Sequence, residues 1–212
     1  MAGPCSVDGG RRPHRHRCRG CNQKICGSDL GALRHGSLPP AAALDAGFAR
    51  HRGLTLVHII PGALFMILGP LQFVRGIRSR WPQLHRWSGR VFVASGLVIG
   101  VSALAMSFKM AIGGATETAA TSSFAILFLF SLIKAFTHIR RGQIAQHREW
   151  MIRAFAIGLA VATIRPIIGL FFALSHQSPH EFFGTAFWIG FTFHLILAEI
   201  WIRNTQRRPA AV

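Results

Sequence analysis

Two histidines stand beside arginine and tryptophan at the start of two separate apolar runs. The stretch LHRWSGRVFV, residues 84–93, contains His85, and the stretch QHREWMIRAF, residues 146–155, contains His147. The two stretches form a weak internal repeat, which would place two imidazoles at one depth on neighbouring helices. Imidazoles in that arrangement can serve as the two axial ligands of a haem iron. The pattern therefore favours His85 and His147 as metal ligands, with haem b as the cofactor.

Other polar residues interrupt the apolar runs. Arg165 lies near the middle of one run, where an arginine costs about 2.5–3.5 kcal/mol in a membrane and therefore needs a partner. At ~1.5 Å of rise per residue, His194 and Glu199 of the next run lie within reach of that arginine. The spacing allows a polar core between the two runs, either as a structural bond between helices or as a functional site. His58 and Gln72 lie near opposite ends of the first run.

The composition places the chain among integral membrane proteins. Half of its residues are hydrophobic and 15% are charged, which leaves too little polar surface for an ordinary soluble domain. A helix needs about 20 apolar residues to cross a bilayer. Helices are expected because backbone groups in lipid must be paired within one segment, and strand-like alternation is absent. The expected fold is an all-α, polytopic membrane helix bundle with five transmembrane helices, over residues 54–74, 91–108, 118–137, 154–174 and 182–202.

The positive charge falls mainly on one side of these spans. The opposite loops contribute Lys109 alone. The positive-inside rule then places the arginine-rich side and the C-terminus in the cytoplasm, for a multi-pass protein of the cell (plasma) membrane. Arginines in these loops could also contact anionic lipid. The arginines on this side are Arg75, Arg78, Arg80, Arg86, Arg90, Arg140, Arg141, Arg148, Arg153, Arg203, Arg207 and Arg208.

The two ends of the chain differ from the spans. Residues 1–52 carry nine lysines and arginines and no apolar stretch typical of a signal or an anchor. We expect them to form a basic, unstructured tail, followed by the helical bundle over 53–203 and a short basic tail over 204–212. The cysteines of the first tail fail to complete the spacing of a zinc knuckle. Five spans would place this basic tail outside, so we expect an upstream span to be missing or the tail not to be the native beginning.

Four motifs follow one another along the spans: HIIPGALFMILGPLQF, LHRWSGRVFV, QHREWMIRAFAIGLAVATIRP and LILAEIWI. In this order and spacing they resemble the bacterial membrane-protein family called domain of unknown function 2306, over about residues 54–203. His194 departs from the family pattern, which usually has asparagine before the closing glutamate. The resemblance implies a membrane fold, but the family name assigns no activity to its members. The positions to which the resemblance draws attention are His58, Gly69, Gln72, His85, Arg86, Gly89, His147, Arg148, Trp150, Met151, Arg153, Arg165 and Glu199.

The first of three function classes is a haem b or quinone-linked redox protein. His85 and His147 would ligate the iron. His58 and His138 are the alternative ligands, and nearby arginines would pair with haem propionates or with a quinone carbonyl. The residues predicted to bind the cofactor are His58, His85, Arg86, His147, Arg148 and Arg165.

Two other classes remain open. One is a small membrane binding or transport protein with a polar site around Arg165, Gln72 and Glu199, in which histidines form hydrogen bonds or carry protons. The other is a membrane scaffold or assembly protein whose arginine-rich loops meet anionic lipid or a partner. The spans show no nucleophile with a base at readable spacing and no glycine-rich phosphate loop, which argues against hydrolases and nucleotide-dependent enzymes. The arginine spacing predicts no specific nucleic-acid contact, and the oligomeric state stays open.

Overall fold

In the computed structural model, the residues described are 48–174 and 179–206, and their fold is a helical bundle. Five of its helices are long and apolar enough to cross a membrane. The expected all-α bundle with five candidate spans is therefore confirmed over the described residues. Of the tails expected over 1–52 and 204–212, residues 1–47 and 207–212 lie outside the described part. The helices are α3 (Arg52–Phe73), α4 (Arg75–Arg80), α5 (Pro82–Lys109), α6 (Gly114–Arg140), α7 (Ile144–Leu174) and α8 (Pro179–Gln206).

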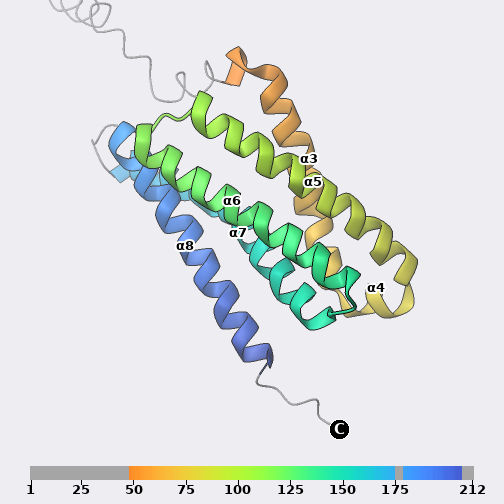
Figure 1. Ribbon diagram of the computed structural model, residues 1–212. Coiled ribbons are helices and arrows are strands. Elements are labelled where there is room, and N and C mark those ends of the chain that lie inside the picture. The colour runs from red at the N-terminus through yellow and green to blue at the C-terminus, as the bar shows by residue number, and fades with distance from the viewer. Residues whose placement is uncertain (1–47, 175–178, 207–212) are drawn as a thin grey trace, which may run out of the picture. The chain divides into compact units, whose positions relative to one another are not determined.

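The long helices lie side by side (Figure 1). α5 packs against α3 and α6, and α7 packs against α6 and α8. Successive long helices run in opposite directions, so one end of the bundle collects α4, the starts of α5 and α7, and the ends of α3, α6 and α8. We call this the arginine-rich end, because it carries the arginines between residues 75 and 90, between 140 and 153, and at 203. The opposite end is called the far end.

Local sequence sets where the helices begin. Pro82 stands at the start of α5, where its missing N–H is not needed. Gly142, with a φ of +73°, makes the turn from α6 into α7, a conformation that favours glycine. At the far end the Glu117 carboxylate accepts hydrogen bonds from the backbone N–H groups of Ile112 and Gly113 at 2.8 and 2.6 Å. These bonds fix the turn that leads into α6.

The helices extend beyond the apolar stretches predicted for them. α5 begins at Pro82 rather than at Val91, and α7 begins at Ile144 rather than at Ala154. The added turns carry the histidine, arginine and tryptophan motifs. Such residues favour the membrane interface without breaking a helix, so hydropathy alone places these helix starts too late.

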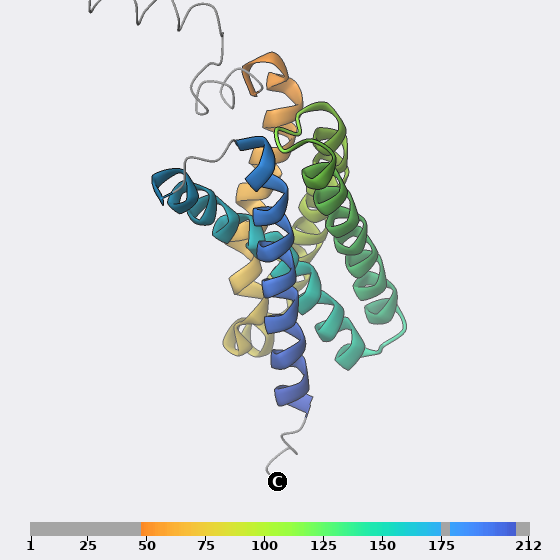
Figure 2. The same cartoon turned by 90° about the vertical axis from the view of Figure 1, so that its left-hand side faces the viewer.

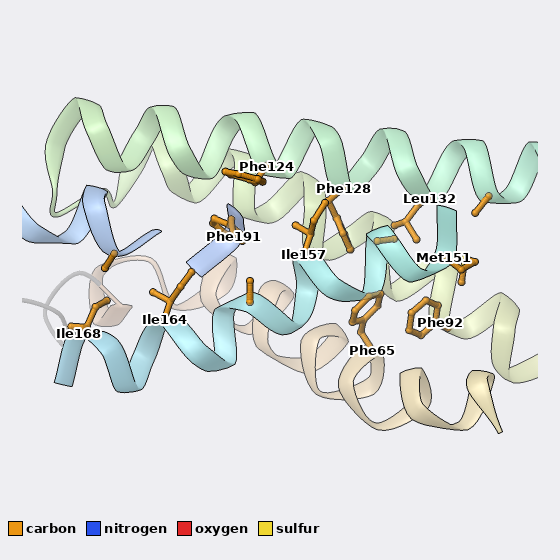
Figure 3. Packing of buried hydrophobic residues seen from close by; sticks show 14 of the residues in the cluster. Phe65, Phe92, Phe124, Phe128, Leu132, Met151, Ile157, Ile164, Ile168 and Phe191 are labelled. Atoms are coloured by element: carbon orange, nitrogen blue, oxygen red, sulfur yellow. The ribbon is translucent and has the colours of Figure 1, made fainter. Parts of the chain in front are cut away.

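Side chains from all five long helices form the core, and the aromatic ones labelled in Figure 3 come from α3, α5, α6 and α8. Phe65 of α3 stacks on Phe92 of α5 with ring centroids 4.1 Å apart, and it meets Phe128 of α6 edge-on at 5.5 Å. Phe155 of α7 lies 6.0 Å from Phe65. The α7 backbone approaches closely at Gly158, where a Cβ would come within 2.6 Å of the Phe65 ring. Small residues at such contacts are expected in lipid, where close packing holds helices together.

α3 and α7 touch in one half of the bundle and separate in the other. Gly69 lies directly against the Phe155 ring, whereas Gly62 and Gly169 face open space. Figure 2 shows α7 running obliquely, with its last turns well to the side of the first turns of α3. The separation therefore lies in the half of the bundle near the far end.

Candidate functional site

His147 lies at the arginine-rich end with one ring nitrogen occupied. Its Nδ1 is 2.8 Å from the carbonyl oxygen of Ala135 on α6. Because a carbonyl oxygen only accepts, Nδ1 carries the proton and donates it, and Nε2 keeps its lone pair. Metal-ligating histidines commonly donate their other N–H to a backbone carbonyl in this way. His147 is therefore prepared to bind a ligand through Nε2.

His85, in the first turn of α5, has a buried nitrogen without a partner. Its Nδ1 is shielded from solvent and forms no hydrogen bond with the described residues. An unsatisfied buried polar atom costs about 1–3 kcal/mol, so a ligand that engages this ring would be favoured. His85 is also close enough to His147 for their charges to interact. The two histidines paired by the sequence thus lie at the same end, each with a nitrogen available.

Gln72, near the end of α3, lies at the same end of the bundle as His85 and His147. Its Nε2 donates to Oγ of Ser88 at 2.8 Å, and Ser88 donates to the carbonyl oxygen of Leu84 at 2.6 Å. Gly89 permits this approach, because a Cβ there would lie 3.2 Å from Oε1 of Gln72. Gln72 is therefore oriented by a hydroxyl group and links α3 to α5.

His138 completes the layer at the end of α6. Its Nδ1 is 2.5 Å from Oε1 of Gln143, and its ring lies close enough to His147 for their charges to interact. In the part of the chain that the structure describes, no group of three or more histidine, cysteine or acidic side chains could hold a metal ion. The layer as a whole, which we call the histidine cluster, consists of Gln72, His85, Ser88, His138 and His147.

The predicted arginines beside the histidine cluster are exposed. Arg86 donates from Nε to the carbonyl oxygen of Pro82 at 3.4 Å. Arg148 forms no hydrogen bond or ion pair with any residue that the structure describes. Arg78 lies close enough to His85 for their charges to interact. These guanidinium groups leave positive charge at the cluster that an anionic ligand could meet.

Glu199 pairs with Arg153 and not with Arg165. Its carboxylate accepts hydrogen bonds from Nε and Nη2 of Arg153 at 2.5 and 3.1 Å, which links α8 to α7. Arg165 stands twelve residues after Arg153 on α7, hence ~18 Å along the helix and ~120° around it. One helix can present only one of these arginines to Glu199. Among the described residues, no hydrogen bond or ion pair joins Arg165 to His194 or Glu199, the three residues of the polar core that the spacing allowed.

His194 is buried, and both of its ring nitrogens have partners. Nδ1 donates to the carbonyl oxygen of Gly190 at 3.0 Å. Nε2 accepts from the hydroxyl of Thr163 on α7 at 3.2 Å. With no nitrogen left for a metal, His194 acts as a link between α7 and α8.

The remaining two predicted cofactor-binding residues lie in the far half of the bundle. His58 is bonded through Nδ1 to Oγ of Ser102 at 2.9 Å. Arg165 is exposed and forms no hydrogen bond or ion pair with the described residues. Of the six predicted cofactor-binding residues, four thus lie at or beside the histidine cluster and two, His58 and Arg165, lie in the far half of the bundle.

Three of the predicted residues are oriented by hydroxyl side chains, which the sequence analysis did not single out. Serine and threonine inside a helix commonly bond to their own backbone, so their presence in an apolar run signals nothing by itself. Their partners lie on other turns or other helices, which only the packing reveals. The pairs are Ser88 with Gln72, Ser102 with His58, and Thr163 with His194.

A family model described as "Predicted membrane protein (DUF2306)" matches residues 55–202, which is more than half of the chain. The chain belongs to this family. The match confirms the resemblance drawn from the four motifs. It covers the histidine cluster as well as His58, Arg165 and Glu199, so all of these sites lie within the part that defines a DUF2306 protein. No curated protein and no solved structure matches the chain.

Proposed function

We propose that this DUF2306 protein is a membrane redox protein that binds haem b at the histidine cluster, where His85 and His147 would hold the iron. The observation that carries the proposal is the hydrogen bond from Nδ1 of His147 to the carbonyl oxygen of Ala135. This bond sets the tautomer and leaves Nε2 as the ligating atom. His85 adds support, because its buried Nδ1 has no hydrogen-bond partner among the described residues.

The surroundings of the histidine cluster suit a cofactor that is largely apolar and carries anionic groups. Arg78, Arg86 and Arg148 supply positive charge that could pair with haem propionates. On the side away from the arginines, the ring of Phe92 is fully buried and Phe155 lies next to it. Bound haem would supply one-electron transfer. The chain would orient the imidazoles through Ala135 and the helix backbones, and its aromatic core would exclude water.

The binding or transport alternative has less support. It needs Arg165, Gln72 and Glu199 around one site. Instead, Gln72 bonds to Ser88, and Glu199 pairs with Arg153. A scaffold role needs no such convergence, so it is the alternative that the test below is designed to separate from the redox proposal.

The absorption spectrum of the purified wild-type protein tests the redox proposal. Protein from haem-supplemented cells, purified in detergent, should show a Soret band and, after reduction, the α-band of a low-spin haem b. Haem content should approach one per chain. A folded but colourless protein would end the proposal and leave the scaffold role.

We further propose that the arginine-rich end faces the cytoplasm and that the protein resides in the plasma membrane. This end carries more arginines than the far end, where Arg50, Arg52 and Lys109 lie. Its excess charge would favour anionic lipid. A reporter fused after Val212 should then report a cytoplasmic location, and one inserted beside Gly114 should report an external location. The reverse pattern would contradict this orientation.

A further inference from the structure

α3 and α7 diverge in the far half of the bundle. The two helices touch where Phe65 lies against Gly158. Beyond that contact the two helices diverge (Figure 2). A Cβ added at Gly62 or at Gly169 would meet no other atom within 4 Å. Pro166 lies inside α7, where a proline removes one helical hydrogen bond and commonly bends the helix. A lipid-soluble molecule could therefore approach the helices here.

His58 and Arg165 lie at one level on the two diverging helices, α3 and α7. His58 stands seven residues before Phe65 on α3, and Arg165 stands seven residues after Gly158 on α7. Because the helices run in opposite directions, both residues lie ~10 Å beyond the contact, toward the far end. Seven residues are close to two helical turns, so each side chain lies on the same helix face as the contact residue. The two groups are also close enough for their charges to interact.

Among the residues that the structure describes, Arg165 has no hydrogen-bond acceptor. Its guanidinium makes no hydrogen bond or ion pair with the described residues, and it lies ~18 Å along α7 from Arg153 at the opposite interface. A cation at such a depth is unfavourable unless an acceptor meets it. The carboxylates whose side chains the structure describes are engaged elsewhere: Glu117 with backbone N–H groups, Glu149 with Gln206, and Glu199 with Arg153.

His58 is a hydrogen-bond acceptor held in a fixed orientation. Ser102 donates its proton to the carbonyl oxygen of Val98 at 2.7 Å, so its oxygen accepts from Nδ1 of His58. In the tautomer that carries the proton on Nδ1, Nε2 of His58 keeps its lone pair. At this level α7 thus supplies a strong hydrogen-bond donor, Arg165, and α3 supplies a hydrogen-bond acceptor, His58.

The depth of this pair narrows the class of ligand. Phospholipid phosphates lie outside the ~30 Å hydrocarbon core, whereas Arg165 lies within a helix that is long and apolar enough to cross it. A ligand here needs an uncharged polar head group and an apolar tail. Its head group must offer an oxygen acceptor to Arg165 and, in one of its forms, a hydroxyl to His58.

We propose that His58 and Arg165 form a binding site for the head group of a membrane quinone. Arg165 donates to a ring oxygen in either redox form, and Nε2 of His58 accepts from a hydroxyl of the quinol. The choice of a quinone rests on the proposed redox function. The site itself rests on three observations: α3 and α7 diverge at this level, Arg165 has no partner among the described residues, and Ser102 orients the imidazole of His58.

Equilibrium binding of decylubiquinone to the full chain in nanodiscs tests the site. Arg165→Gln and His58→Gln should each raise the Kd about tenfold, since each removes a hydrogen bond at a charged or oriented partner. Lys134→Gln is the matched control, because it removes a cation from another span, where Lys134 lies 5.5 Å from the centroid of the Phe130 ring. The control should bind like the wild type. Since Arg165 is exposed, Arg165→Gln should fold normally and is the decisive variant.

The outcomes separate this site from the haem proposal. A wild-type Kd in the Arg165→Gln variant would overturn the quinone site. The quinone site would also be overturned if phosphatidylglycerol displaced decylubiquinone with an affinity that depends on Arg165. That result would show that Arg165 binds an anionic lipid. A colourless protein that binds decylubiquinone through Arg165 and His58 would remove the haem and keep the quinone site. A haem spectrum without quinone binding would give the opposite result.

Discussion

Replacing His147 with glutamine should abolish the low-spin haem spectrum while leaving the protein folded in the membrane. The imidazole Nε2 is the proposed ligating atom, and a glutamine amide cannot replace it at the iron. His85→Gln should have the same effect, because both imidazoles would be needed to hold the iron. The measurement is the Soret and reduced α-band absorbance per folded chain, with the folded fraction determined by size-exclusion chromatography.

Two other histidine variants serve as controls for the loss of the haem spectrum. His138→Gln changes the third histidine of the cluster, and His194→Gln changes one whose nitrogens both have protein partners. Both variants should keep the spectrum. If the spectrum survives in both the His85 and the His147 variants, the iron ligands lie elsewhere, and His58 becomes the first candidate. Loss of the spectrum in all four variants would indicate a general packing defect instead of ligation.

The sequence predicts those parts of the fold that depend on one segment at a time. Long apolar runs identify the five candidate spans, because the bilayer requires a minimum helix length regardless of the neighbours. The alternation of helix direction then places His85 and His147 at one end. The helix starts were predicted too late, because hydropathy falls at the interface while backbone hydrogen bonding continues through residues such as Trp87 and Trp150.

The pairing of polar groups could not be predicted in the same way. Depth along the membrane made Arg165 a reasonable partner for Glu199, but the rotation of α7 decides which arginine faces α8, and it selects Arg153. That rotation follows from tight contacts at residues such as Gly158, whose neighbour Phe65 belongs to another helix. The separation of α3 from α7 depends on the same contacts, so the place of Arg165 beside His58 appears only in three dimensions.

Adding one methyl group at Gly69 should destabilise the bundle, whereas the same change at Gly62 should not. At Gly69 a Cβ would overlap three atoms of the Phe155 ring, while at Gly62 it would meet nothing within 4 Å. Overpacking of this kind costs about 1–3 kcal/mol. In an open helical position, alanine is favoured over glycine by about 1 kcal/mol. The thermal unfolding midpoint in detergent should therefore fall for Gly69→Ala and stay constant or rise for Gly62→Ala.

The Phe155 ring supplies a further check on the cause of the Gly69 effect. Phe155→Leu removes the ring atoms that an alanine at position 69 would meet, so Gly69→Ala should cost less in that background than in the wild type. Residues in direct contact show such non-additive effects, whereas distant residues do not. Gly62→Ala combined with Phe155→Leu should be additive, because the Gly62 position meets no ring atom. Equal costs of Gly69→Ala in both backgrounds would show that the close approach of α3 to α7 does not depend on this contact.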